Sequence, residues 1–151
     1  PTATPKPGNL TPTSSVPKPT TTPNPTNPTP AVVTGAGTSY GSNFVSVSGM
    51  PARLKRGQRV RVTVTYRNNS TVAWQPREIT LGSRNPINNF RWGLNRVALS
   101  KEVLPGKQAT FTFIVKAPST AGTYNFQWRT KKAHAEWFGE FTKNRKIKVV
   151  K

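Results

Sequence analysis

The chain contains no cysteine and no aspartate, and it has one histidine, His134, and four acidic residues, all of them glutamate. Without cysteine there is no disulfide framework and no thiolate metal site, and the remaining ligands are too few for a metal cluster. Without aspartate no Ser-His-Asp triad forms, which leaves only a glutamate variant open. Paired carboxylates for acid–base catalysis need two acids in one pocket, and scattered glutamates fit that poorly. We therefore predict a protein that is not an enzyme and uses no cofactor.

Long hydrophobic runs are also missing. No apolar stretch approaches the roughly 20 residues that a membrane-spanning helix needs, and no signal-peptide pattern is present. We therefore expect no membrane span in this segment. Because the sequence begins at Pro1 rather than at methionine, we expect it to be a piece of a longer protein.

Positive charge is abundant: 23 Lys and Arg give the 151 residues a formal net charge of +19. Such a surface attracts polymers that carry phosphate or carboxylate groups, and the attraction depends strongly on salt. The alternative is a surface that only keeps the protein soluble. No base-reading motif is present, so nucleic-acid binding should be non-specific. The basic residues that we expect to bind an anionic partner are Arg59, Arg61, Arg129, Lys131, Lys132, Lys146 and Lys148.

Residues 1–30 differ from the rest of the chain, because ten of them are Pro and nine are Thr. Such a segment buries too little apolar surface to offset its ordering entropy, so we expect residues 1–38 to be an extended linker or stalk. Its composition fits either an unmodified linker or an O-glycosylated stalk outside the cell. The candidate O-glycosylation sites are Thr11, Thr13, Thr20, Thr21, Thr22, Thr26 and Thr29.

From residue 39 onward, apolar and polar residues alternate with a period of two, which is typical of half-buried strands. The clearest case is residues 58–66, where Val60, Val62 and Val64 alternate with Arg59 and Arg61. Turn signals between such segments have sandwich-like spacing. We predict about seven short strands: 44–47, 58–66, 72–74, 79–81, 109–115, 122–129 and 141–150.

The two most aromatic of these strands, 109–115 and 122–129, are joined by a short loop that contains Pro118. We expect them to pair as a hairpin at the centre of a β-sandwich. We expect residues 131–140 to be a connecting loop. The residues predicted for the core are Trp74, Trp128, Phe111, Phe113, Tyr124 and Phe126, whereas Trp92 and Trp137, on loops, are candidates for a binding surface.

Several short motifs resemble the four-tryptophan (FW) immunoglobulin-like domain family, which occurs as the central domain of selective-autophagy cargo receptors and in bacterial (Chloroflexi-type) secreted proteins. The motifs are Asn69-Ser70-Thr71-Val72-Ala73-Trp74, Leu104-Pro105-Gly106, Lys116-Ala117-Pro118, Gly122-Thr123-Tyr124, Trp128 and Trp137-Phe138-Gly139. The resemblance implies an all-β, immunoglobulin-like antiparallel sandwich over residues 39–151. It also implies protein binding or an accessory role, without catalysis. The Pro/Thr-rich segment favours a bacterial protein at the cell surface or outside the cell.

Three functions remain open at this point. The first is a non-catalytic extracellular module that tethers a larger protein to an anionic polysaccharide, a cell-envelope polymer or a protein. The second is a structural subunit of an extracellular filament or surface layer, a homo-oligomer in which the Pro/Thr tail docks on neighbouring subunits. The third, a small hydrolase, is disfavoured by the counts of acids and histidine.

Overall fold

The computed structural model describes residues 39–151, which form an all-β domain. The predicted linker at residues 1–38 and its candidate glycosylation sites lie outside the described residues. The strands are β1 (Ser42–Ser48), β2 (Arg53–Lys55), β3 (Arg59–Asn68), β4 (Ile79–Arg84), β5 (Arg96–Ala98), β6 (Gln108–Lys116), β7 (Gly122–Lys132), β8 (Trp137–Phe141) and β9 (Arg145–Val150).

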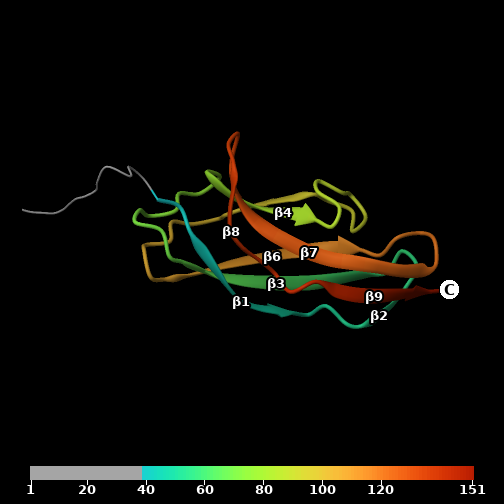
Figure 1. Cartoon of the computed structure of the whole chain (residues 1–151). Coiled ribbons are helices and arrows are strands. Elements are labelled where there is room, and N and C mark those ends of the chain that lie inside the picture. The colour runs from blue at the N-terminus through green and yellow to red at the C-terminus, as the bar shows by residue number, and fades with distance from the viewer. Residues whose placement is uncertain (1–38) are drawn as a thin grey trace, which may run out of the picture. The chain divides into compact units, whose positions relative to one another are not determined.

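The strands form two sheets (Figure 1). One sheet has three strands in the order β1-β3-β6. The other has six, in the order β2-β9-β7-β4-β5, with β8 pairing with β7. Every pair is antiparallel except β2 with β9, which is parallel. This is the sandwich-like architecture that the alternating sequence predicts.

Strands β3 and β6 show how the alternating pattern builds one layer. In their register Val62 lies opposite Phe113, and all buried residues of β3 and β6 face the second sheet. On the outer side of the same sheet the hydroxyls of Thr63 and Thr112 lie 3.1 Å apart and share a hydrogen bond. One face is therefore apolar and the other mostly polar, with Ile114 as an exposed apolar residue on the outer side, in keeping with the period of two.

The core lies between the two sheets and is rich in aromatic rings. The Phe113 and Trp128 ring centroids, from opposite sheets, are 5.1 Å apart, and Phe126 lies 5.8 Å from Trp128. The Tyr66 hydroxyl crosses the sandwich and donates to the carbonyl oxygens of Glu140 (2.8 Å) and Trp128 (3.3 Å). Burial of this phenol raises its pKa well above the ordinary value. The phenol therefore links the layers as a neutral donor.

The predicted hairpin between the two aromatic strands is wrong. Strands β6 and β7 belong to different sheets, so the loop between them crosses from one layer to the other. β6 pairs with β3, and β7 pairs with β4, β8 and β9. The alternation of residues does not distinguish the two arrangements, because a hairpin and a crossing between layers both turn the apolar side chains of the two strands toward one core.

The structure also has strands that the sequence pattern did not predict. Residues 131–140, expected to be a loop, contain the end of β7 and most of β8. The final strand begins at Arg145 rather than at Phe141, and β2 is a short additional strand at the edge of its sheet. Between residues 39 and 151 there is no helix long and apolar enough to cross a membrane.

Candidate functional site

Acidic side chains gather at one end of the sandwich, where β7 ends and β1 begins. The Glu78 carboxylate accepts a hydrogen bond from the Tyr40 hydroxyl at 3.4 Å and lies 3.9 Å from Lys132 Nζ. The Glu140 carboxylate accepts from the backbone N–H of Phe44 at 2.8 Å. These partners belong to the start of β1 or the end of β7. Two of the four glutamates of the chain are therefore fixed at this end by contacts within the domain.

The other two glutamates lie at the same end. Glu102 accepts from Gln75 Nε2 at 2.9 Å, beside the bridge between Trp74 and Val103. Asn68, the last residue of β3, donates to the carbonyl of Val103. Glu136 is in the turn between β7 and β8. We call this region the glutamate end, defined by Glu78, Glu102, Glu136 and Glu140.

At the opposite end β3 begins, and β6 and β9 end (Figure 1). Several of the exposed side chains at this end are cationic. An open depression of about 410 Å³ is lined by Lys55, Arg56, Gly57, Lys116, Ser119 and Lys151, so it has four cations and no acidic side chain. Arg59 lies next to it, directly opposite Lys116 in the sheet. We call this region the basic end, defined by Lys55, Arg56, Arg59, Lys116 and Lys151.

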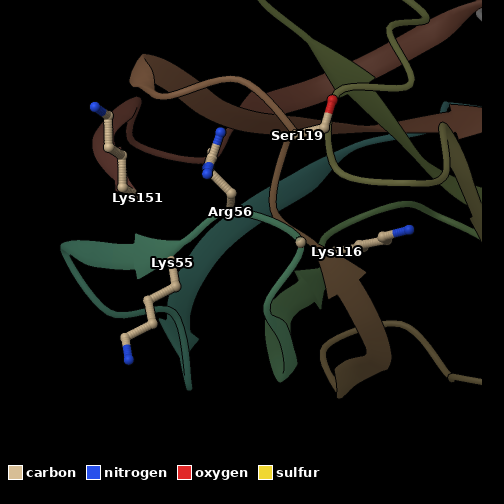
Figure 2. A pocket seen from close by; sticks show the side chains of 6 residues that line it. Lys55, Arg56, Lys116, Ser119 and Lys151 are labelled. Atoms are coloured by element: carbon tan, nitrogen blue, oxygen red, sulfur yellow. The ribbon is translucent and has the colours of Figure 1, made fainter.

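Backbone contacts hold the basic end in place. The Gly57 N–H donates to the carbonyl oxygen of Ala117 at 3.2 Å, which joins the turn after β2 to the chain after β6. Gly57 has a φ of 70°, which a residue with a side chain rarely adopts. In Figure 2 the side chains of Arg56 and Lys151 extend to one side, whereas Lys55 and Lys116 point away from them. The depression therefore spreads its charges around a rim, which suits an extended anionic ligand better than a small enclosed one.

The basic residues predicted from the sequence are not all on one surface. Arg59 and Arg61 are exposed on the outer face of the three-stranded sheet, and Lys146 and Lys148 are exposed on the outer face of the six-stranded sheet. The two pairs therefore lie on opposite faces of the sandwich. Only Arg59 belongs to the basic end.

Arg129 and Lys131 lie on the outer face of the six-stranded sheet, together with Trp137. They form part of a row in which cationic and aromatic side chains alternate. The centroid of the Trp137 ring lies 4.8 Å from the guanidinium carbon Cζ of Arg96 and 4.6 Å from that of Arg84. The centroid of the Phe141 ring lies 5.0 Å from the Cζ of Arg84 and 4.6 Å from that of Arg129. We call this row the arginine–aromatic stack, in the order Arg96, Trp137, Arg84, Phe141 and Arg129.

The strand register explains the stack. Gly82 on β4 lies opposite Arg96 on β5 and opposite Arg129 on β7, and Arg129 lies opposite Phe141 on β8. Residues opposite one another in a sheet point to the same face, so four strands contribute to one row. Lys131 extends the row, because its Nζ lies 6.0 Å from the Trp137 centroid.

Lys132, the remaining predicted basic residue, has a different environment. Its Nζ lies 4.6 Å from the Tyr40 ring centroid and 3.9 Å from the Glu78 carboxylate. The Tyr40 side chain, and then the charges of Glu78 and Glu136, raise the pKa of Lys132. Its charge is therefore already compensated within the domain, and it is a poor candidate for an external anion.

The expectation that Trp92 presents a ligand-binding surface is wrong. Trp92 is only 1% exposed, and its Nε1 donates to the carbonyl oxygen of Asn125 at 2.9 Å. The loop that carries Trp92 folds against the core, where the ring centroids of Trp92 and Phe126 lie 5.8 Å apart. Trp137, by contrast, is half-buried on the outer face, and Tyr124, predicted for the core, is also half-buried. The predicted core residues that the structure buries are Trp74, Trp128, Phe111, Phe113 and Phe126.

Sequence reasoning missed part of both regions. It did not single out Phe141, because β8 has aromatic residues on both faces, which obscures the alternation that would have assigned Phe141 to one surface. It also missed Arg84 and Arg96, because they join the stack only through the pairing of β4 and β5 with other strands. For the basic end, the adjacent Lys55 and Arg56 before Gly57 are a usable signal, since cations at a glycine turn are held at a strand end. Among residues 39–151 no cluster of His, Cys, Asp or Glu fits a metal ion.

Comparison with known proteins bears on the fold. No curated protein matches this sequence. One similar solved structure is the crystal structure of a Niemann-Pick type C2 protein from Japanese carpenter ant, with 14% sequence identity and a TM-score of 0.41; the match covers 74% of this chain and 95% of that chain. The model of the family described as the Ig-like domain from next to BRCA1 gene matches residues 51–144. The chain therefore belongs to this family of Ig-like domains.

Proposed function

We propose that residues 39–151 are a non-catalytic binding module that attaches a larger protein to an anionic polymer at the cell surface. The observation that carries this proposal is the separation of charge along the sandwich. The open depression at the basic end is lined by four cations, whereas all four glutamates belong to the other end. A polymer such as an acidic polysaccharide has the charge and length that this end would attract.

The physical argument rests on how exposed charges act in water. Single exposed ion pairs contribute little, but several like charges grouped at one end create a potential that raises the local concentration of a polyanion. Residues 39–151 carry 21 Lys and Arg against four Glu, which leaves a net charge of +17. Over distances of about 8 Å at physiological salt these charges act together, so binding should be broad in specificity and sensitive to salt.

Three finer statements belong to the same proposal. The chain fits the four-tryptophan branch of the Ig-like family, since it has four tryptophans, of which Trp74, Trp92 and Trp128 are buried in the core. An extracellular location is supported by the Pro/Thr-rich composition of residues 1–38, which suits a spacer between a surface and a binding domain. The absence of catalysis is supported by the engagement of Glu78 and Glu140 in structural contacts.

The test compares two triple variants of the full chain that remove equal charge. Lys55→Gln, Arg56→Gln and Lys116→Gln neutralise the basic end. Arg67→Gln, Lys101→Gln and Lys107→Gln, three exposed positions near the glutamate end, are the matched control. We expect the first variant to elute from immobilised heparin at a clearly lower salt concentration than the second. Equal elution of the two variants would contradict a localised site and leave only a general effect of net charge.

Sedimentation velocity on the same samples addresses the alternative of a filament or surface-layer subunit. The tethering module should remain monomeric without ligand. Concentration-dependent assembly of the full chain, lost on removal of residues 1–38, would favour the structural subunit instead.

A further inference from the structure

The arginine–aromatic stack holds its central guanidinium in a fixed position. Arg84 lies between two rings, with its Cζ 4.6 Å from the Trp137 centroid and 5.0 Å from the Phe141 centroid. Each contact of this type attracts the guanidinium to the face of the ring. A side chain that is normally flexible is therefore ordered before any ligand arrives, which lowers the entropy cost of binding.

The positive charge in the stack has no acidic partner among residues 39–151. The ion pair that the structure records for these residues joins Lys132 to Glu78, outside the stack. Burial, and then the neighbouring charge of Arg129, hold the pKa of Arg84 below its usual value. Burial also lowers the pKa of Arg96. The site therefore concentrates three guanidinium groups whose mutual repulsion an anion would relieve.

Some of the guanidinium hydrogen-bond donors in the stack have no partner within the described residues, and others do. The Arg84 guanidinium makes no hydrogen bond to any residue in the described part of the chain, so its N–H donors are unused within the domain while its Cζ lies against the two rings. Arg129 uses Nε to bind the carbonyl oxygen of Gly139 at 2.8 Å, which leaves its two Nη groups. Arg96 is different, because its Nη1 and Nη2 donate to Asn95 O and Asn88 Oδ1. The available donors therefore belong to Arg84 and Arg129, whose Cζ atoms lie 5.0 and 4.6 Å from the centroid of the same Phe141 ring.

From this geometry we propose that Arg84 and Arg129 form a binding site for a single oxyanion group, a phosphate, sulfate or carboxylate carried by a ligand. Arginine presents planar pairs of N–H donors that match such oxygens, and charge-assisted bonds of this kind are among the strongest in proteins. This site is on the outer face of the six-stranded sheet and does not depend on the basic end. It goes beyond a general attraction for polyanions, because it has defined donors and a fixed geometry.

The chemistry of the rings narrows the ligand further. Nucleobases and sugar rings bind aromatic side chains by stacking on an open ring face. In the stack, guanidinium groups lie over both rings, two over Trp137 and two over Phe141. The rings therefore serve to position the arginines, and recognition is of the oxyanion itself rather than of the molecule that carries it.

The experiment uses the full chain and three small probes: inorganic phosphate, sulfate and acetate. Each is titrated while NMR records the guanidinium Nε–H resonances and the indole N–H of Trp137. We expect saturable shifts at Arg84, Arg129 and Trp137 in the wild type. The affinities for phosphate and sulfate, compared with the affinity for acetate, show whether the site prefers a tetrahedral or a planar oxyanion. Arg84→Gln should lower the affinity for the tightest-binding probe at least about tenfold, a change of about 1.4 kcal/mol in binding free energy.

Two further variants separate binding from stabilisation. Arg84→Lys retains the charge but not the planar fork, so we expect it to lose most of the affinity while the thermal midpoint changes little. Arg67→Gln removes one exposed arginine on the other sheet and should leave the affinity unchanged. The proposal is overturned if Arg84→Gln binds the probes as the wild type does, or if the wild-type shifts occur only at the basic end. The variant Lys55→Gln/Arg56→Gln should retain the shifts at the stack, so failure here and failure of the proposed function are distinguishable.

Discussion

The ring of Trp137 rests with its edge on the backbone of Gly82. A Cβ at position 82 would lie 2.5 Å from Trp137 Cη2 and 2.6 Å from Arg96 Nη1, closer than real Cβ contacts come. The backbone of Gly82 does not have a positive φ, so its conformation does not explain why a glycine is found at this position. The glycine is therefore required by the stack above it, because only a residue without a side chain leaves room for the indole.

The first prediction follows from this contact. Gly82→Ala should displace Trp137 and open the arginine–aromatic stack, so that oxyanion affinity falls about tenfold. Stability should change by only about 1 kcal/mol or less, because the indole is half-exposed and can move, and because alanine suits a strand better than glycine does. The indole N–H resonance of Trp137 and a thermal melt report the two effects separately. Thr123→Ala, at an exposed position of β7, is the control, and an unshifted Trp137 in Gly82→Ala would contradict the packing described.

A second prediction compares the three buried tryptophans. Trp74 Nε1 donates to Ser70 Oγ at 2.8 Å and Trp92 Nε1 to the Asn125 carbonyl at 2.9 Å, whereas Trp128 Nε1 has no partner within the described residues. Each tryptophan replaced by phenylalanine loses ring volume, but only the first two also lose a hydrogen bond. A bond of this kind contributes about 1 kcal/mol. Trp128→Phe should therefore be the least destabilising of the three by about that amount.

Chemical denaturation measures the free energy of unfolding of each of the three variants. The values can be compared if the free energy falls with denaturant concentration at the same slope in all three. A larger loss for Trp128→Phe than for Trp74→Phe would contradict the prediction and would mean that shape, rather than hydrogen bonding, sets the order. Trp128→Ala is a reference for these losses, because removal of a fully buried ring should lower the free energy of unfolding by about 3–5 kcal/mol.

The third prediction concerns Asn68, a fully buried amide at the end of β3. Its Nδ2 donates to the carbonyl oxygens of Val72 (3.0 Å) and Val103 (2.9 Å), and its Oδ1 accepts from the Ser70 N–H at 2.8 Å. Asn68→Ala removes three bonds and leaves buried groups without partners, which should cost about 2–4 kcal/mol. The free energy of unfolding is the measurement.

The neighbouring Asn69 provides the control for this variant. It is exposed, and its Nδ2 donates to Asn43 Oδ1 at 3.0 Å. Asn69→Ala should cost less than about 1 kcal/mol, because water replaces an exposed hydrogen bond at little cost. Similar losses at the two positions would show that the turn, and not the buried amide, is what stabilises this region.

Much of the fold could be predicted from the sequence because one physical signal dominates it. In β3 and β6 each buried residue is followed by a half-buried or exposed one, so the strands, their faces and the core aromatics follow from the pattern. Which strand pairs with which did not follow, since Phe113 and Trp128 contact each other across the core rather than within a sheet. Side-chain period gives the face of a strand and says nothing about its neighbours.

The candidate sites were less predictable for a related reason. Trp92 was expected at the surface because it lies outside the regular strands, but a buried loop is stable when its polar groups find partners, as its indole does with Asn125. Strand β8 has Trp137 and Phe141 on one face and buried Phe138 on the other, so its aromatic residues do not alternate with polar ones. The stack depends on register among four strands, which no local pattern encodes.

The last prediction concerns the salt dependence of the basic end. Oligothymidylate serves as a polyanion of known charge density, for which the logarithm of the affinity falls linearly with the logarithm of salt, by about 0.7 per phosphate contact. Lys55→Gln should reduce this slope by about 0.7, and Lys55→Gln/Arg56→Gln by about twice that, if both side chains at the rim contact phosphate. Lys107→Gln, near the glutamate end, should leave the slope unchanged, and oligoadenylate should bind with the same slope because no bases are read. A slope that falls equally for Lys55→Gln and Lys107→Gln would mean that the polymer binds the whole surface, and the separation of charge along the sandwich would then have no role in recognition.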